Sequence, residues 1–413
     1  MAQQLPTFTI DFDLRPAYFD RFQCLAGACR FTCCKGWHVG FDKKDYLALK
    51  RQEGSPELTE TLQRIVRRVK KGPNAGRWYG EFDLGGGACP LQRENGLCSL
   101  QLEKGADALP IVCRMFPRGK RYSDAGYLER TLSPACEAVL ELLWDLPDGV
   151  DFVADPLPRR EQKEGRFQAG TALLPRTQDV RSMCIDLLQD RRYPLAQRIL
   201  LMGLALKELA DGEEDVDGWL ARTRTLADDP ETAGRLQLPD SPQTLSMFLL
   251  NNVKLLLTTA VPGGDFEKVP EEVAAGLNIQ LKRLSLDSAN ASVPNEPYLA
   301  ARARFEENFQ DRAYFMENLM VSLFFNFQTP NLGSREKLWK SYVDFCNLYS
   351  FCRFMAVASC REGAAGDKAE LFRMIVCTSR GLMHNTPQKT KLRDEFFQND
   401  SATLAHMAIL LCG

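Results

Sequence analysis

The distribution of cysteines constrains this chain more than any other feature of its sequence. Of its 413 residues 14 are cysteines, and eight of these lie before residue 137: Cys24, Cys29, Cys33, Cys34, Cys89, Cys98, Cys113 and Cys136. Disulfide scaffolds are normally short secreted chains, whereas this chain is long and its first residues lack a charged segment followed by an apolar one. We therefore expect a cytoplasmic protein, in which clustered thiols indicate metal or redox chemistry.

Composition excludes several classes of protein. A formal net charge of −2 and a pI near 6.1 give no overall basic surface, so we expect no nucleic-acid partner. The hydrophobic fraction of 45% is sufficient for sizeable cores. No apolar run approaches the roughly 18 residues of a membrane span. The sequence therefore predicts a globular chain with no transmembrane segment.

The chain divides into three zones with different patterns. We expect a small, irregular, cysteine-rich metal- or cluster-binding domain over residues 1–150, a linker and helical segment over 151–240, and a C-terminal helical domain over 241–413. Apolar residues recur at helical spacing over 195–209, 242–259, 300–328, 335–360, 367–384 and 392–412. Alternation typical of a strand is short, as over 127–132, and we expect polar connections over 145–176 and 211–240. The predicted fold class is mainly α, with an α-helical body after the cysteine-rich domain.

The spacing of the early cysteines suits a metal site, because short loops that carry thiols are joined by longer segments that can bring the sulfurs together. Thiolates favour zinc, iron–sulfur clusters or copper(I). Cys89 and Cys98 are too far apart for a zinc knuckle. Cys33 and Cys34 are adjacent, and their side chains point apart in most backbone conformations. If both are ligands, they must therefore bind different irons of one cluster or belong to different sites. An iron–sulfur cluster is favoured, and zinc is the alternative metal.

Eight candidate ligands are more than one four-thiolate cluster needs. Either the chain has two sites, or some of the eight thiols surround the ligands without binding. For any single cysteine, simple packing is a further alternative.

Specific segments resemble known families. The segment 89–118, CPLQRENGLCSLQLEKGADALPIVCRMFPR, resembles the YkgJ-type cysteine-cluster domain, a family described as zinc- or iron-chelating. The opening Phe22-x-Cys24-x4-Cys29-x3-Cys33-Cys34-Lys35-Gly36-Trp37 is similar to that of the flagellin lysine-N-methylase family. Further landmarks that look similar are the segment 128–133 before Cys136, Glu317-Asn318, and Arg380 with His384-Asn385. The resemblance runs from about residue 15 to 390.

This resemblance implies a protein-lysine N-methyltransferase that uses S-adenosylmethionine to methylate ε-amines of flagellin, with a [4Fe-4S] cluster held by the early cysteines. Neither common motif for that cofactor is present. The run Gly85-Gly86-Gly87 leads into Cys89 rather than into a helix, and Gly36 stands where a radical three-cysteine loop needs its third cysteine. A cluster iron without a protein ligand could instead bind the cofactor's amino and carboxylate groups.

A methyl acceptor lysine needs help from the enzyme. With a pKa near 10.4 it is roughly 99.9% protonated at pH 7, so the enzyme must supply a base or desolvate the amine. The candidate catalytic residues are Glu317 and His384, and the candidate cofactor-binding residues are Trp37 and Arg380. His384 has a plain alternative as a core or capping histidine, and Glu317 as a structural carboxylate.

Two other functions are compatible with the sequence. The chain could be another S-adenosylmethionine-dependent alkyl-transfer enzyme that modifies a different peptide or protein, or it could be a non-enzymatic zinc- or iron-chelating protein. Basic residues over 64–71 and 114–121 most simply face solvent, and their functional alternative is contact with an acidic partner or, as peripheral membrane contact, with anionic lipid. The expected partner is flagellin or another protein or peptide substrate, and the sequence does not determine the oligomeric state.

Overall fold

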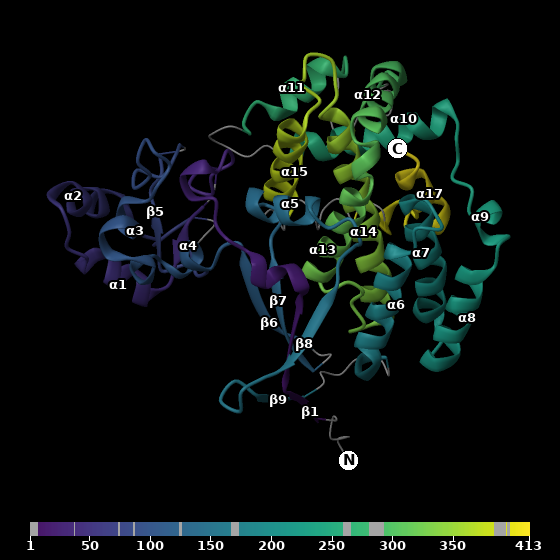
Figure 1. Ribbon diagram of the computed structural model, residues 1–413, viewed down its shortest axis with the longest axis horizontal. Coiled ribbons are helices and arrows are strands. Elements are labelled where there is room, and N and C mark those ends of the chain that lie inside the picture. The colour runs from purple at the N-terminus through teal and green to yellow at the C-terminus, as the bar shows by residue number, and fades with distance from the viewer. Residues whose placement is uncertain are drawn as a thin grey trace.

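The computed structural model describes residues 7–36, 38–72, 75–85, 87–123, 126–166, 173–258, 266–280, 293–383, 394 and 397–413. These residues are mainly helical, which confirms the predicted fold class at that level. Figure 1 shows a large helical body, a sheet along its lower side, and a smaller unit of short helices and strands at the left.

The helical body is organised around α14 (Arg335–Ala358), whose side chains are mostly buried. The other helices of the body are α6 (Thr177–Gln189), α7 (Leu195–Asp211), α8 (Val216–Asp228), α9 (Thr232–Arg235), α10 (Pro242–Thr258), α11 (Val269–Gly276), α12 (Asn295–Asn308), α13 (Tyr314–Asn326), α15 (Lys368–Met383) and α17 (Leu404–Leu411). Helices α7, α10, α12, α13, α15 and α17 contact α14, so α14 is apolar on nearly every side. Within the described ranges, no helix is long and apolar enough to cross a bilayer.

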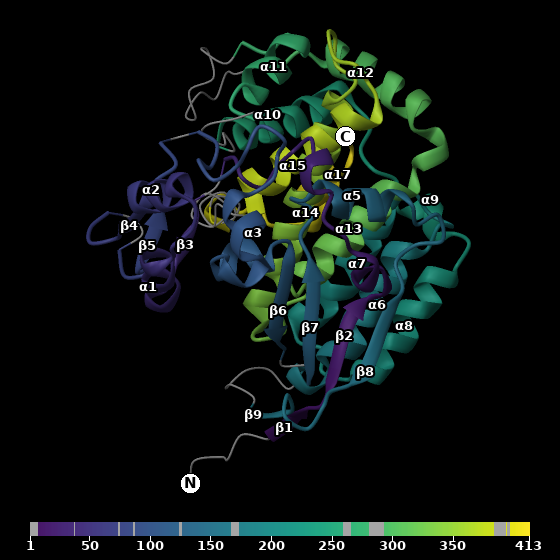
Figure 2. The same cartoon turned by 60° about the vertical axis from the view of Figure 1, so that its left-hand side comes forward.

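A four-stranded sheet lies against this body. Its order is β6 (Arg118–Tyr122), β7 (Tyr127–Leu132), β2 (Phe12–Pro16) and β8 (Phe152–Pro156), as Figure 2 shows with the strands side by side. Strand β2 is parallel to β7, and the other pairs are antiparallel. The predicted strand over 127–132 is β7, which contacts α13. The chain leaves β7 toward α5 (Glu137–Trp144), so Cys136 lies where the sheet meets the helices.

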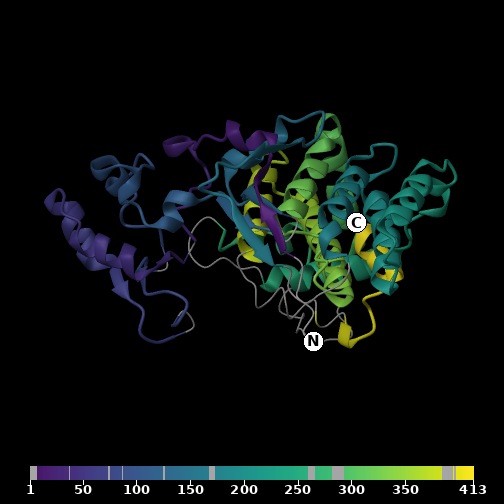
Figure 3. The ribbon, with the colours of Figure 1, turned by 90° about the horizontal axis from the view of Figure 1, so that it is seen from below.

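Residues 39–115, which we call the satellite unit, surround a separate hydrophobic core. This satellite core contains Val39, Phe41, Leu49, Leu58, Leu62, Ile65, Val66, Phe82, Leu91 and Leu100. Its elements are β3 (Gly40–Phe41), α1 (Lys43–Arg51), α2 (Pro56–Ile65), β4 (Val66–Arg68), β5 (Gly80–Phe82), α3 (Ser99–Lys104) and α4 (Ile111–Met115), with sheet order β3-β5-β4. Figure 3 shows this unit standing to one side of the helical body.

The structure corrects both predicted polar connections. The stretch 145–176 contains β8 and β9 (Lys163–Arg166), because the N-terminal β2 and β1 (Thr7–Ile10) offer them edges for antiparallel pairing. The stretch 211–240 contains α8, which forms because Asp215 accepts a hydrogen bond from Gly218 N at 3.0 Å and Trp219 is fully buried.

The predicted helix over 300–328 is two helices, α12 and α13, separated by a 3-10 turn, η6 (Gln310–Arg312). Other 3-10 turns are η1 (Ala17–Arg21), η2 (Ala26–Ala28), η3 (Ala106–Ala108) and η4 (Leu174–Arg176).

Candidate thiol-rich site

The eight early cysteines come from four segments that meet between the satellite unit and the helical body. The first four lie in the loop that joins η1 to β3, two lie between β5 and α3, one lies on α4, and one precedes α5. All eight are free thiols. The two hydrophobic cores that Cys136, Cys89 and Cys98 pack against divide the thiols into two sets.

The satellite-side set consists of Cys34, Cys89, Cys98 and Cys113. Backbone pairing connects the segments that carry three of them: Cys89 N donates to Cys34 O at 2.7 Å, and Cys98 forms an antiparallel bridge with Gln92. Each thiol of the set interacts electrostatically with the other three. Cys89 and Cys98 also pack against the satellite core, so this set belongs to the satellite unit.

The body-side set consists of Cys24, Cys29, Cys33 and Cys136. Cys136 lies at the N-terminal end of α5 and packs against the main hydrophobic core. Its thiol interacts electrostatically with those of Cys24, Cys29 and Cys33. The two sets meet at the adjacent Cys33 and Cys34, whose side chains hydrogen-bond to each other.

A buried carboxylate orders the loop that carries the body-side thiols. Glu137, which is only 1% exposed, is the first residue of α5. Its Oε2 accepts hydrogen bonds from Arg30 N at 2.6 Å, Phe31 N at 3.2 Å and the Cys29 thiol at 3.4 Å, and its Oε1 pairs with the Arg30 guanidinium. The negative charge is also favourable at the N-terminus of a helix. Helix α5 therefore fixes the shape of this loop.

A buried guanidinium connects the same loop to the helical body. Arg380 on α15 is 4% exposed and donates to Phe31 O at 2.6 Å, Lys35 O at 3.4 Å and Ala135 O at 3.5 Å. Its guanidinium carbon lies 4.8 Å from the centre of the Phe266 ring. The predicted cofactor-binding residue therefore lies against the body-side thiols, and its role toward a cofactor stays a prediction.

Burial dominates the protonation of these thiols. It raises the pKa of Cys29 to about 12, with a further rise from the Glu137 carboxylate. Burial likewise raises the pKa of Cys89 to about 12 and that of Cys136 to about 11. Cys34 differs, because the hydrogen bond from Cys33 lowers its pKa. Most of the thiols are therefore neutral at pH 7 without a metal, and metal binding must release protons.

No group of three or more His, Cys, Asp or Glu side chains in the described part of the chain is arranged to hold a single metal ion. A four-iron cluster makes a different demand, because each thiolate binds a separate iron and the sulfurs stand farther apart than around one ion. Four cysteine thiols, the donor chemistry of each set, are the ligands of such clusters. The residues present therefore fit an iron–sulfur centre.

The candidate base Glu317 lies in an ion-pair network on α13. Its Oε1 accepts hydrogen bonds from Arg191 Nε at 3.1 Å and Nη2 at 2.8 Å, and its Oε2 accepts from Arg191 Nε at 3.1 Å and Arg198 Nη1 at 2.6 Å. These bonds join α13 to Arg191, which lies between α6 and α7, and to Arg198 on α7. The arrangement is that of a structural carboxylate, and a role as base stays a prediction. Trp37 and His384, the other predicted site residues, lie outside the described residues.

Sequence reasoning missed Glu137, which proves to be a central residue of the body-side loop. A signal was available, because Glu137 directly follows Cys136 and opens the largely apolar segment EAVLELLW. A carboxylate in such a segment is either exposed or bound to partners that compensate its burial. The pattern alone did not identify those partners, which lie more than 100 residues earlier in the chain.

A cavity of about 430 Å³ opens beside Cys113, and its lining was also missed. Its lining consists of Ile111, Val112, Met115, Phe116, Pro117, Arg118, Gly119, Thr131, Ser133, Asn326 and Phe327. The apolar wall is largely α4, the helix that carries Cys113. Its volume lies within the range of about 300–1,000 Å³ that is usual for small-molecule pockets.

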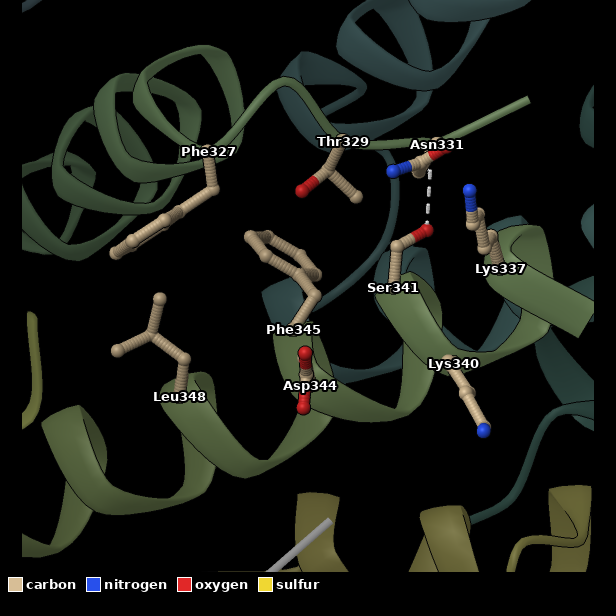
Figure 4. A pocket seen from close by; sticks show the side chains of 9 residues that line it. All are labelled: Phe327, Thr329, Asn331, Lys337, Lys340, Ser341, Asp344, Phe345 and Leu348. Carbon is tan, nitrogen blue, oxygen red and sulfur yellow. Dashed lines mark hydrogen bonds between the residues drawn. The ribbon is translucent and has the colours of Figure 1, made fainter. Parts of the chain in front are cut away.

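Phe327 also lines a second cavity, of about 180 Å³. Figure 4 shows the side chains of Phe327, Phe345 and Leu348 at one end of it, and Ser341 and Asn331 at the other. There Asn331 N donates to Ser341 Oγ at 3.0 Å. This second cavity is smaller than usual ligand pockets.

Comparison with known proteins places this architecture in a family. A family model described as the FliB lysine N-methylase C-terminal domain matches residues 181–410. A lysine-N-methylase of Salmonella typhimurium (strain LT2) is 36% identical over 140 residues, which are 33% of this chain and 33% of that protein. Flagellar biosynthetic protein FliU of Salmonella muenchen is 34% identical over 140 residues, which are 33% of this chain and 78% of that protein.

The alignment with the matched lysine-N-methylases thus spans about a third of their length. No solved structure matches the chain at a significant level. The family model covers residues 181–410, more than half of the 413 residues, and includes both α13 and α15. The chain therefore belongs to the FliB lysine N-methylase family.

Proposed function

We propose that this chain is a protein-lysine N-methyltransferase that transfers methyl groups from S-adenosylmethionine to surface lysines of flagellin, and that its early cysteines hold an iron–sulfur cluster. The observation that carries the proposal is the family match over 181–410. The names of the matched lysine-N-methylases support the reaction, and that of flagellar biosynthetic protein FliU supports a flagellar substrate.

The convergence of thiols supports the cluster. Either four-thiol set has the ligands that a four-iron centre takes, and Arg380 offsets part of the negative charge that thiolates on the body side would carry. When bound, such a centre supplies redox chemistry or an iron that acts as a Lewis acid. Glu137 keeps the loop with Cys29 in shape, so we expect the chain itself to preorganise the ligands.

The 430 Å³ cavity supports the acceptor half of the reaction. Met115, Phe116 and Phe327 offer apolar surface to a lysine side chain that enters it, and partial burial disfavours the ammonium form. Arg118 adds a like charge, which lowers the pKa of an inserted lysine further. No carboxylate occurs among the described residues that line the cavity. This environment favours the neutral amine, whose proton passes to water before the methyl transfer.

The direct test is methyl transfer to purified flagellin, followed by mass spectrometry of its lysines. The chain is purified without oxygen and supplied with S-adenosylmethionine that carries a labelled methyl group. We expect labelled flagellin with wild-type protein, and for Arg118→Glu a rate at least about tenfold lower at pH 7.5, since one unit of lysine pKa changes the neutral fraction tenfold. The rate of that variant should recover at higher pH. Arg114→Glu, a change of the same kind at an exposed residue of α4, serves as the control.

The same experiment separates the alternatives. Bound zinc without iron, together with no transfer to any protein, would favour a non-enzymatic chelating protein. Methyl transfer to another protein but not to flagellin would favour an alkyl-transfer enzyme with a different substrate. An Arg118→Glu rate equal to wild type at every pH would contradict the placement of the lysine in the cavity.

A further inference from the structure

We infer that the eight early cysteines form two separate four-thiolate sites, each of which binds its own soft metal centre. This assignment rests on the proposed function, which requires only one cluster, and extends it to the second set of thiols. A four-iron cluster takes four thiolates, so eight thiols are twice what one cluster needs.

The satellite-side set is complete as a ligand set. All six pairs among its four thiols interact electrostatically. The backbone supports this arrangement, since Cys89 N donates to Cys34 O at 2.7 Å and Lys35 pairs with Ala88 in an antiparallel bridge. On α4, Ile111 N donates to Asp45 Oδ2 at 2.8 Å, which ties the helix of Cys113 to α1.

The body-side set is held by different elements. Cys136 interacts with the other three thiols, and Arg380 interacts with Cys29, Cys33 and Cys136 as well as with the neighbouring Cys34. Glu137 accepts hydrogen bonds from the loop at 2.6 Å and 3.2 Å. A buried cation beside these three thiols reduces the cost of gathering their negative charge away from water.

Two separate cores position the two sets, which is why one shared site is the poorer description. Cys136 packs against the main core, whereas Cys89 and Cys98 pack against the satellite core. The adjacent Cys33 and Cys34 provide one ligand to each set. Cys33 also interacts with Cys113, so the two centres lie next to each other.

The adjacent pair provides the sharpest test, because Cys33→Ser and Cys34→Ser alter neighbouring positions of one loop. The full chain is purified without oxygen, and iron, sulfide and zinc are counted per chain. We expect about eight irons and eight sulfides in the wild type, four of each for each four-iron cluster. Cys33→Ser should lose the body-side centre alone, and Cys34→Ser the satellite-side centre alone.

A single serine can still bind iron through its oxygen. Double variants then identify each centre, because they remove two ligands of one set. Cys29→Ser with Cys136→Ser should leave the absorption and EPR signals of the satellite-side centre, and Cys89→Ser with Cys98→Ser those of the body-side centre. Cys412→Ser, which changes a half-buried thiol outside both sets, should keep all the metal. Circular dichroism checks that each variant is folded.

Two outcomes would overturn the assignment: a wild-type chain with one centre, or a folded variant in which either single serine removes all the metal. Flagellin methylation is measured on the same samples. Methylation by a protein with one centre would refute the second site and leave the proposed function intact. Two centres without methylation of any protein would support the second site and refute the proposed function.

Discussion

The two thiol sets contain the same side chains, yet the structure supports them by different means. The body-side set depends on buried charge, because Glu137 and Arg380 hold its loop through hydrogen bonds to the backbone. The satellite-side set depends on backbone pairing and on a small apolar core. The body-side loop should therefore respond to single charge changes, and the satellite-side set to packing changes. Three predictions test this difference, and a fourth tests a buried thiol outside both sets.

The largest effect is expected for Glu137→Ala. The backbone N–H groups of Arg30 and Phe31 lose a charged acceptor, which we expect to cost about 3–5 kcal/mol of unfolding free energy. Urea denaturation measures the loss, and iron analysis should show that only the body-side centre is missing. Glu141→Ala, which removes a partly exposed carboxylate of the same helix, is the control and should cost under about 1 kcal/mol. Equal losses from the two variants would contradict the role of Glu137.

Phe41→Ala should act on the other region. Phe41 is fully buried in the satellite core, and replacing such a ring costs about 3 kcal/mol or more. We expect hydrogen exchange to quicken in α1, α2 and β5 while α14 stays protected, because the satellite core is separate from the main one. Phe12→Ala, which removes a 40% exposed ring, is the matched control. Loss of protection in α14 as well would show that the two cores unfold as one.

Arg380→Met should have a smaller effect on stability, about 2 kcal/mol, since it removes charged hydrogen bonds to Phe31 O and Ala135 O. It should also lower the reduction potential of the body-side centre, because a nearby positive charge favours the reduced, more negative state. Redox titration followed by EPR measures both centres in one sample. Arg380→Lys keeps the charge and should therefore keep most of the reduction potential. If Arg380→Met shifted the potential of the satellite-side centre as much as that of the body-side centre, the difference between the two sets would be refuted.

The smallest effect concerns the late, fully buried thiols. Burial raises the pKa of Cys352 from 9.0 to about 12. A folded-state pKa above the unfolded one means that the thiol's contribution is complete below about pH 9 and is lost as pH rises to about 12. We expect Cys352 alone to remove about 1.4 kcal/mol between pH 8 and pH 10, measured by urea denaturation of metal-loaded protein. Cys352→Ala should make the unfolding free energy fall less steeply between pH 8 and pH 10. If the fall were the same as in the wild type, the raised pKa of Cys352 would be wrong.

Much of the architecture could be predicted from the sequence because it depends on local patterns. The apolar stripe over 195–209 and the N-cap at Asp42 correspond to α7 and α1, and Asp42 Oδ1 accepts from Asp45 N at 2.8 Å. The strands β8 and β9 were missed because their partners are at the other end of the N-terminal zone, and edge pairing of that kind leaves little local signal.

By itself, the sequence determined that eight thiols come early in the chain, that the fold is mainly α, and that the spacing suits a soft metal centre. Only the tertiary structure decided how those thiols divide, because the division depends on contacts such as that of Arg380 with Phe31, 349 residues apart. It also decided that Glu137 is a buried anchor and that a cavity opens beside Cys113. A charged residue has a defined role only when folding removes its water and supplies a partner, and no local pattern of residues specifies that partner.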